Sequence, residues 1–328
     1  MSKALRDNTF DIMKGIGILM VLLGHTWGLP SMTHVISSFH MPLFFIIAGY
    51  FSKSYADYES KDIYAVIGHY ARRLIPPYIV TMLCILAWEV LMALTKGGWN
   101  GVITQTISLF WADVCVLSTP WGGVNIGVVW FLLALFWAKT FLLLLSRWQQ
   151  WLLPVSILLS IAALLLHLIF PYSLWCVSLG LVALPFVSIG WWFRHHHLPW
   201  WGTIICIICW VLALWMSSLD MYEYTFDCYP LDMIGACGGT LCVYWLSRGI
   251  NRLKSWGAAP VFAYLGRISL AIMCVHCIEM ATHLGSHIVA LTPWAPLPIW
   301  GLYVVRYTLT ILLAIGIVNT PYIKRIFA

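Results

Sequence analysis

The amino-acid sequence predicts an all-α integral membrane protein, a bundle of about ten transmembrane helices with both termini in the cytoplasm. Only 9% of its 328 residues are charged and 62% are hydrophobic, whereas soluble domains carry about 25% charged residues. The apolar runs are long and continuous, unlike the alternating pattern of a membrane β-barrel. The 20 Trp residues suit the aromatic belts at bilayer interfaces. We expect one transmembrane domain over residues 1–328, with no separate soluble domain.

Ten apolar runs bounded by turn-forming residues give the expected spans, since each crossing needs about 20 residues. They are Phe10–Leu29, His34–Phe51, Leu74–Leu94, Asn125–Ser146, Trp151–Phe170, Tyr172–Trp192, Trp200–Ser218, Pro230–Ser247, Pro260–Ala281 and Pro298–Asn319. The stretch Val102–Ser118 is also apolar, but it carries a stripe of Thr, Gln, Ser and Asp side chains. It is expected to be an interfacial helix in a long outer loop.

The distribution of basic residues supports this topology. Cytoplasmic loops and tails would contain Lys3, Arg6, Lys53, Lys61, Arg72, Arg73, Arg147, Arg194, Arg248, Arg252, Lys254, Lys324 and Arg325, whereas the outer loops would contain only Lys96. This bias satisfies the positive-inside rule. An eleventh span at Val102 would move Arg194 and Arg248 to the outside. The outer loops carry acids instead, namely Asp113, Asp220, Glu223 and Asp227.

Two ionisable residues interrupt the first span. Ionisable side chains are costly in the hydrocarbon region and by default mark a functional cavity. Lys14 and His25 are eleven positions apart, which places them about 16 Å apart along a helix and on nearly the same face. The structural alternative is a snorkelling lysine and a histidine that is hydrogen-bonded inside the bundle. Gly15 and Gly17 in the same span are interpreted as a site of close helix packing.

Further histidines gather in the outer half of the predicted bundle, among them His40. Imidazole exchanges its proton near neutral pH. His276, Glu279 and His283 fall on one face of the ninth span, which also allows a metal site, a proton relay or a wall that binds an acceptor. His283 and His287 are expected to lie beyond the end of that helix. Cys115 and Cys228 fall in outer loops, where they either pair or remain free thiols.

The main cytoplasmic loop ends in paired arginines, Arg72 and Arg73. They can simply follow the positive-inside bias, but a guanidinium also binds phosphate oxygens in bidentate fashion. A phosphorylated ligand that arrives from the cytoplasm is therefore plausible. The sequence has no Gly-rich loop that would cradle nucleotide phosphates.

Several sequence blocks resemble the membrane acyltransferase-3 family, in particular its fucose 4-O-acetylase-like branch. They are Phe10-Asp11-Ile12-Met13-Lys14-Gly15-Ile16-Gly17-Ile18 with Gly24-His25, Phe39-His40-Met41-Pro42-Leu43-Phe44-Phe45 with Gly49-Tyr50-Phe51, Arg72-Arg73 with Pro76-Pro77-Tyr78, Val129-Trp130-Phe131-Leu132, and Leu265-Gly266-Arg267-Ile268-Ser269-Leu270 with His276. Together they touch most of the chain. In two places the chain departs from the family pattern. His69 and Tyr70 stand three positions before the paired arginines, where the family often has another arginine, and Ala48 replaces a serine at the close of the second span.

The resemblance implies a ten-span enzyme of the bacterial plasma (inner) membrane. Such an enzyme takes an acyl group, usually acetyl, from cytoplasmic acyl-CoA and delivers it to a hydroxyl of an extracytoplasmic glycan. Lys14 and His25 match the family's pairing of a basic residue with its catalytic histidine. Acetyl-CoA is then the co-substrate, and neither a metal nor a nucleic acid is expected to bind.

Residues and resemblance together give a mechanistic hypothesis. Lys14, Arg72 and Arg73 would bind the CoA donor, and His25 would act as general base or carry the acyl group itself. The acceptor would contact His40, His276, Glu279 and Arg306, and Glu279 or Asp11 would orient His25. Two alternatives remain open on the residues alone. They are a proton-coupled exporter of a glycan or small metabolite, and a polyprenyl-linked glycosyltransferase that uses outer-loop acids.

Overall fold

The computed structural model is almost entirely helical and divides into two compact units that are interleaved along the chain. It describes residues 7–25, 30–58, 62–109, 117–118, 127–170, 173–253, 257–292 and 297–327. Unit 1 comprises Met1–Ser52 and Phe186–Leu270, and unit 2 comprises Lys53–Pro185 and Ala271–Ala328. The boundaries fall after α3, inside α7 next to a helix-interior proline, and near the start of α11.

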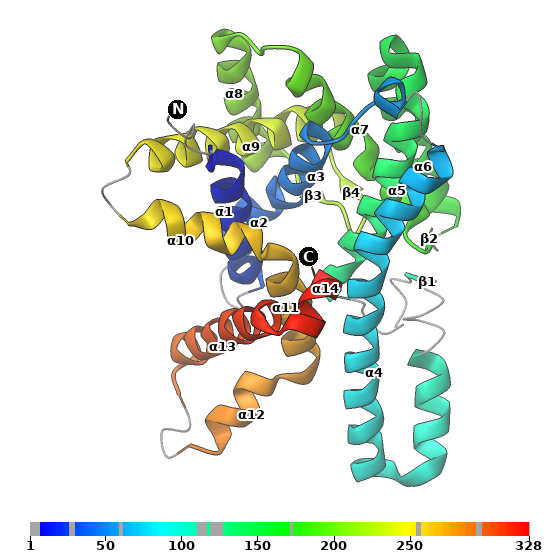
Figure 1. Cartoon of the computed structure of the whole chain (residues 1–328), viewed down its shortest axis with the longest axis vertical. Helices are drawn as coiled ribbons and strands as arrows, with labels where there is room; N and C mark the ends of the chain where they lie inside the picture. Colours follow the sequence, from blue (N-terminus) through cyan, green and yellow to red (C-terminus); the bar gives the residue numbers. More distant parts are fainter. Residues whose placement is uncertain are drawn as a thin grey trace. The chain divides into compact units, whose positions relative to one another are not determined.

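Unit 1 contains the first three helices and a later group of helices with a short hairpin. Its elements are α1 (Thr9–Gly24), α2 (Pro30–Ser37), α3 (His40–Tyr50), the second half of α7 (Val177–His195), α8 (Trp200–Met216), β3 (Leu219–Asp220), β4 (Thr225–Phe226), α9 (Tyr229–Arg252) and α10 (Ala258–Arg267). Helix α1 lies beside α10, as Figure 1 shows in blue and yellow. β3 and β4 pair antiparallel between α8 and α9.

Glycines bring the helices of unit 1 into backbone contact. A Cβ on Gly15 would collide with the backbone carbonyl of Phe262, and a Cβ on Gly266 would collide with that of Asp11. In the same way, Gly49 of α3 faces the backbone of Val187 in α7. Small residues permit such close approach of membrane helices. The predicted packing role of Gly15 is therefore confirmed.

Unit 2 contains the remaining helices. Its elements are η1 (Tyr55–Tyr58), α4 (Ile63–Leu109), β1 (Leu117–Ser118), η3 (Gly127–Val129), α5 (Trp130–Leu145), η4 (Ser146–Trp151), α6 (Leu152–Ile169), β2 (Ser173–Leu174), the first half of α7, most of α11 (Ser269–Thr282), α12 (Leu284–Ala290), α13 (Ile299–Asn319) and α14 (Pro321–Phe327). Helix α4 packs on α5, and α12 packs on α13.

The segment expected to be an interfacial helix is only partly helical. Helix α4 continues to Leu109 and turns back on itself at its far end (Figure 1). Residues 110–116, and with them Asp113 and Cys115, lie outside the described residues. Leu117 and Ser118 form β1, which pairs antiparallel with β2 at Leu174 and Ser173. The helix thus ends before the predicted Ser118.

Every predicted span contains a helix or a pair of helices, but the number of crossings is not confirmed. In the described ranges, five segments are long and apolar enough to cross a membrane, or six if the bent pair α10 and α11 forms one span. That pair bends by 69°. Gly127–Ile169 counts as one segment although it contains both α5 and α6, which meet at the non-helical Trp148. The all-α membrane architecture stands, and ten crossings remain a prediction.

Contacts within each unit test which loops share a side. In unit 1 the Asn251 amide at the end of α9 donates to the Asp7 carboxylate before α1, at 2.9 Å. In unit 2 the Tyr55 amide donates to the Ser146 hydroxyl, at 2.8 Å. Asp7, Tyr55 and Asn251 are predicted to be cytoplasmic, and Ser146 ends a predicted span on that side. β1 belongs to the predicted outer loop and pairs with β2, which lies at the outer end of the predicted span Tyr172–Trp192. The pairing of loops agrees with the sequence, while the absolute orientation stays a prediction.

Candidate active site

His25 lies at the C-terminal end of α1. It is the residue that follows the last helical residue, Gly24, and its side chain is half-buried. Lys14 lies on the same helix, as the spacing predicted. Around His25, α2 is tied to its neighbours, because the Thr33 hydroxyl donates to the Gly24 carbonyl at 3.2 Å and the His34 ring contacts the Leu214 carbonyl at 3.1 Å. The end of α1 is therefore held by a short helix that packs close to it.

A second histidine and a carboxylate lie within electrostatic range of His25. They are His40, the first residue of α3, and Asp220, the last residue of β3. The His40 Nδ1 donates to the Ile36 carbonyl at 2.8 Å, so a neutral His40 ring keeps its Nε2 as an acceptor. Asp220 is half-buried, and its Oδ1 accepts the backbone N–H groups of Tyr222 and Glu223 at 2.9 and 3.2 Å. Two imidazoles and a fixed carboxylate thus gather at one end of unit 1.

The opposite end of α1 carries a compact charged group. The Lys14 ammonium lies 2.8 Å from one oxygen of the buried Asp11 carboxylate, and the Arg267 guanidinium lies 3.9 Å from the other. Asp11 is therefore engaged with two cations. The carboxylate near His25 is Asp220 rather than this residue. Just outside the helix, hydrogen bonds from the Thr9 side chain and backbone lower the pKa of Asp7.

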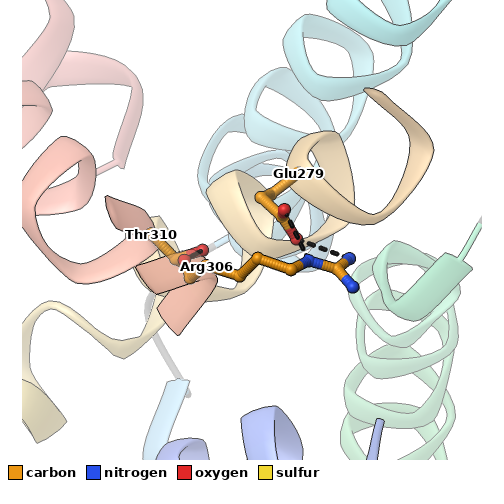
Figure 2. A network of polar contacts seen from close by, with 3 residues as sticks. All are labelled: Glu279, Arg306 and Thr310. Atoms are coloured by element: carbon orange, nitrogen blue, oxygen red, sulfur yellow. Dashed lines mark hydrogen bonds and ion pairs between the residues drawn. The ribbon is translucent and has the colours of Figure 1, made fainter. Parts of the chain in front are cut away.

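In unit 2, Glu279 of α11 and Arg306 of α13 form a buried ion pair. The Arg306 Nε and one terminal nitrogen donate to the two carboxylate oxygens at 2.7 and 2.9 Å (Figure 2). The Glu279 side chain is 2% exposed and that of Arg306 13%. Thr310 lies one turn after Arg306 on α13, and its hydroxyl donates to the Arg306 carbonyl at 2.9 Å. Such a bidentate pair fixes both side chains.

His276 is buried one turn before Glu279 on α11. Its ring packs edge-on to Tyr307 of α13, with the ring centroids 6.3 Å apart. His283 does not continue this face, because α11 ends at Thr282 and His283 takes a positive φ of 49°. His287 belongs to α12. The expectation that both lie beyond the helix is confirmed. Within the described ranges, no group of three or more His, Cys, Asp and Glu residues is arranged to hold a metal ion.

The paired arginines of α4 have different neighbours. Both are exposed, but the Arg72 Nε donates to the Gly68 carbonyl of its own helix at 3.3 Å. Arg73 instead lies within electrostatic range of Lys139 on α5. The predicted site residues therefore fall into separate clusters, with Lys14, His25 and His40 in unit 1 and the arginines, His276 and Glu279 in unit 2.

Comparison with known protein families identifies the chain. The model of the acyltransferase domain family Acyl_transf_3 matches residues 7–318. The chain belongs to the acyltransferase-3 family. No curated protein and no solved structure matches it significantly. The family match shows a membrane acyltransferase in general, and it covers every residue assigned above to a candidate site.

Two residues of this acyltransferase's clusters had no assigned role in the sequence. From the sequence, Asp220 is only one of several outer-loop acids, and Lys139 is a basic residue inside the predicted span Asn125–Ser146. Asp220 is about 195 positions from His25, and only the fold brings the β3–β4 hairpin to α1. For Lys139 a signal existed, because an ionisable residue inside a span marks function by default.

Proposed function

We propose that this acyltransferase moves an acetyl group from cytoplasmic acetyl-CoA to a hydroxyl of an extracytoplasmic glycan in a bacterial inner membrane. His25 acts as the general base. The observation that carries the proposal is the position of His25 at the end of α1, within electrostatic range of His40 and Asp220. The family match supplies the class of reaction.

A sugar hydroxyl needs a base because its pKa lies far above neutrality. In the proposed step the His25 ring takes the hydroxyl proton, the hydroxyl oxygen attacks the thioester carbonyl, and the C–S bond breaks. The CoA sulfur leaves and takes a proton from the His25 imidazolium. A positioned base contributes about 10²- to 10⁴-fold in rate. The carboxylate of Asp220 favours the charged imidazolium that forms in this step.

The remaining assignments concern substrate binding. His40 is proposed to hold the acceptor hydroxyl, since its Nε2 remains an acceptor when Nδ1 donates to Ile36. On the donor side, Lys14, Arg72 and Arg73 are proposed to bind the CoA phosphates.

Within unit 2, His276, Glu279 and Arg306 are proposed to contact a glycan acceptor. The planar Glu279–Arg306 pair offers carboxylate oxygens and guanidinium N–H groups that suit sugar hydroxyls.

The test is a thiol-release assay on the purified protein in lipid nanodiscs. Acetyl-CoA is supplied with and without a panel of methyl glycosides, and free CoA is measured. We expect CoA release that rises with at least one glycoside and falls at least 100-fold in His25→Ala. The matched control is His197→Ala, because His197 is an exposed histidine between α7 and α8. Acceptor-dependent release that survives His25→Ala would refute the assigned base, and no release with any acceptor would refute the transferase.

A further inference from the structure

Two basic side chains of unit 2 lie close together on neighbouring helices. Lys139 of α5 and Arg73 of α4 interact electrostatically, and α4 packs on α5. The Lys139 ammonium lies over the face of the Tyr70 ring, 4.4 Å from its centroid. Tyr70 is buried, and its hydroxyl is hydrogen-bonded to that of Tyr58 in η1. The Tyr70 side chain therefore contacts Lys139 through its ring face and Tyr58 through its hydroxyl.

No carboxylate neutralises these two cations in the part of the chain that the structure describes. The ion pairs there involve Lys14, Arg267 and Arg306, and none includes Lys139 or Arg73. The two acids that precede α4 make local hydrogen bonds, since Asp57 accepts from Ser54 and Asp62 accepts from the Tyr64 amide. Two like charges close together destabilise each other unless an anion joins them.

The position of Lys139 indicates that this anion enters between the helices. Lys139 lies seven residues before Ser146, which caps α5, so it is about 10 Å inside the helix end. That end is the one predicted to face the cytoplasm. A lysine at such depth is costly in an apolar surrounding. The cation–π contact with Tyr70 offsets part of that cost, by about 2 kcal/mol or more for a desolvated pair, but it adds no negative charge.

We propose that Lys139, together with Arg73, binds a phosphate group of the acyl-CoA donor. The inference rests on the proposed function and adds a residue to its donor site. Lysine supplies a point charge to phosphate and arginine supplies a bidentate fork, so the two side chains complement each other on one phosphate group. Arg72, which donates along its own helix, contributes less. Lys139 is thus a donor-binding residue that the paired arginines alone do not reveal.

The experiment measures CoA affinity without acceptor, by calorimetric titration of the full chain in nanodiscs of phosphatidylcholine. Lys139→Gln and Arg73→Gln are each expected to weaken CoA binding roughly ten- to a hundred-fold, as for a lost charged hydrogen bond. Lys139→Arg should recover most of the affinity, which separates lost charge from damaged packing. The matched control is Arg147→Gln, because Arg147 also stacks on a tyrosine, Tyr55, at 5.6 Å, but lies outside the proposed site. It should change the affinity less than twofold.

Anionic lipid headgroups carry the same phosphate chemistry, so a second arm repeats the titration in nanodiscs that contain phosphatidylglycerol. CoA affinity that depends on Lys139 in both lipids supports the proposal. Lys139→Gln protein that binds CoA like wild type, but is no longer stabilised by phosphatidylglycerol, would assign the site to lipid and overturn it. Normal CoA binding in both Gln variants, with intact turnover, would overturn this inference alone. Wild-type protein that binds no CoA would overturn the proposed function as well.

Discussion

At the scale of single residues, the proposed chemistry depends on a histidine that lies within electrostatic range of a carboxylate from a distant part of the chain. His25 ends α1, and Asp220 is presented by the β3–β4 hairpin, whose own backbone N–H groups hold one carboxylate oxygen. Because that carboxylate is fixed, its charge acts on the imidazole without further ordering. Asp220 is therefore a positioning residue, and its effect should depend on charge.

Asp220→Asn is expected to lower transfer about ten-fold or more while CoA affinity stays unchanged, because the charge that favours the imidazolium is lost. Asp220→Glu should restore part of the activity. Turnover and calorimetric CoA affinity, measured on the same samples, check this. Asp227→Asn is the matched control, since Asp227 is an exposed acid beside the same hairpin that accepts from the Ser218 amide at 3.0 Å. Equal loss in both variants would point to a damaged hairpin rather than a lost charge.

Sequence reasoning reaches some of these residues and not others for a physical reason. Lys14 and His25 lie on one helix, where spacing alone predicts their relative position. The small residues Gly15 and Gly17 in one apolar span likewise predict close helix packing, although they do not identify the partner helix. The approach of Asp220 to His25, and of Lys139 to Arg73, depends on which helices pack together. No periodicity in a single sequence encodes that choice.

At the scale of elements, α11 and α13 are joined by the Glu279–Arg306 pair. Removal of one partner from a buried ion pair costs about 3–5 kcal/mol, because the other charge stays buried alone. Gly285 of α12 leaves room for this pair, since a Cβ there would lie 2.7 Å from the Arg306 Cγ. The pair is therefore structural as well as a candidate for acceptor binding.

A double-mutant cycle separates the two roles of the pair. Glu279→Gln and Arg306→Gln are each expected to lower the thermal unfolding midpoint, and the double variant should be more stable than the sum of the two losses predicts. If the pair also binds acceptor, the double variant remains inactive in transfer although its CoA affinity is normal. Thermal unfolding and acceptor-dependent CoA release are the measurements. A stable double variant with full transfer would confine the pair to a structural role.

The crossing of α1 and α10 depends on glycine. Gly15→Ala is expected to destabilise the protein by about 1–3 kcal/mol or more, because its Cβ meets the Phe262 backbone, which cannot rotate away as a side chain can. Gly249→Ala in α9 is the control. It is exposed, with nothing within 4 Å of a new Cβ, and alanine favours helix. Midpoints of thermal unfolding in detergent compare the two, and equal midpoints would contradict the packing role of Gly15.

Apolar runs located the helices well, and they predicted the breaks at Trp148 and His283, since the expected spans end at Ser146 and Ala281. They did not predict the bend between α10 and α11, which falls inside the expected span Pro260–Ala281 and has no proline at the break. Tertiary packing decides such positions. The sequence also did not predict the length of α4. The helix continues from the expected span Leu74–Leu94 into the stretch that begins at Val102, because the polar side chains there do not end it.

At the scale of the whole molecule, the orientation in the membrane decides which substrate meets which end. The basic residues predict that the β3–β4 hairpin faces outward and the α7–α8 turn faces the cytoplasm. In a Cys115→Ser, Cys228→Ser background, an impermeant maleimide applied to intact cells should label Glu223→Cys and miss His197→Cys. Both positions are exposed. Labelling with the opposite pattern would invert the donor and acceptor sides.

The central claim is that the acetyl group crosses from a cytoplasmic donor to an outer acceptor with His25 as base. It is tested most directly in right-side-out membrane vesicles with radiolabelled acetyl-CoA sealed inside and the glycan acceptor outside. We predict labelled acceptor outside and an equal amount of free CoA inside for the wild type, and neither for His25→Asn. Acetylation that requires donor and acceptor on the same side, or that persists in His25→Asn, would contradict the account.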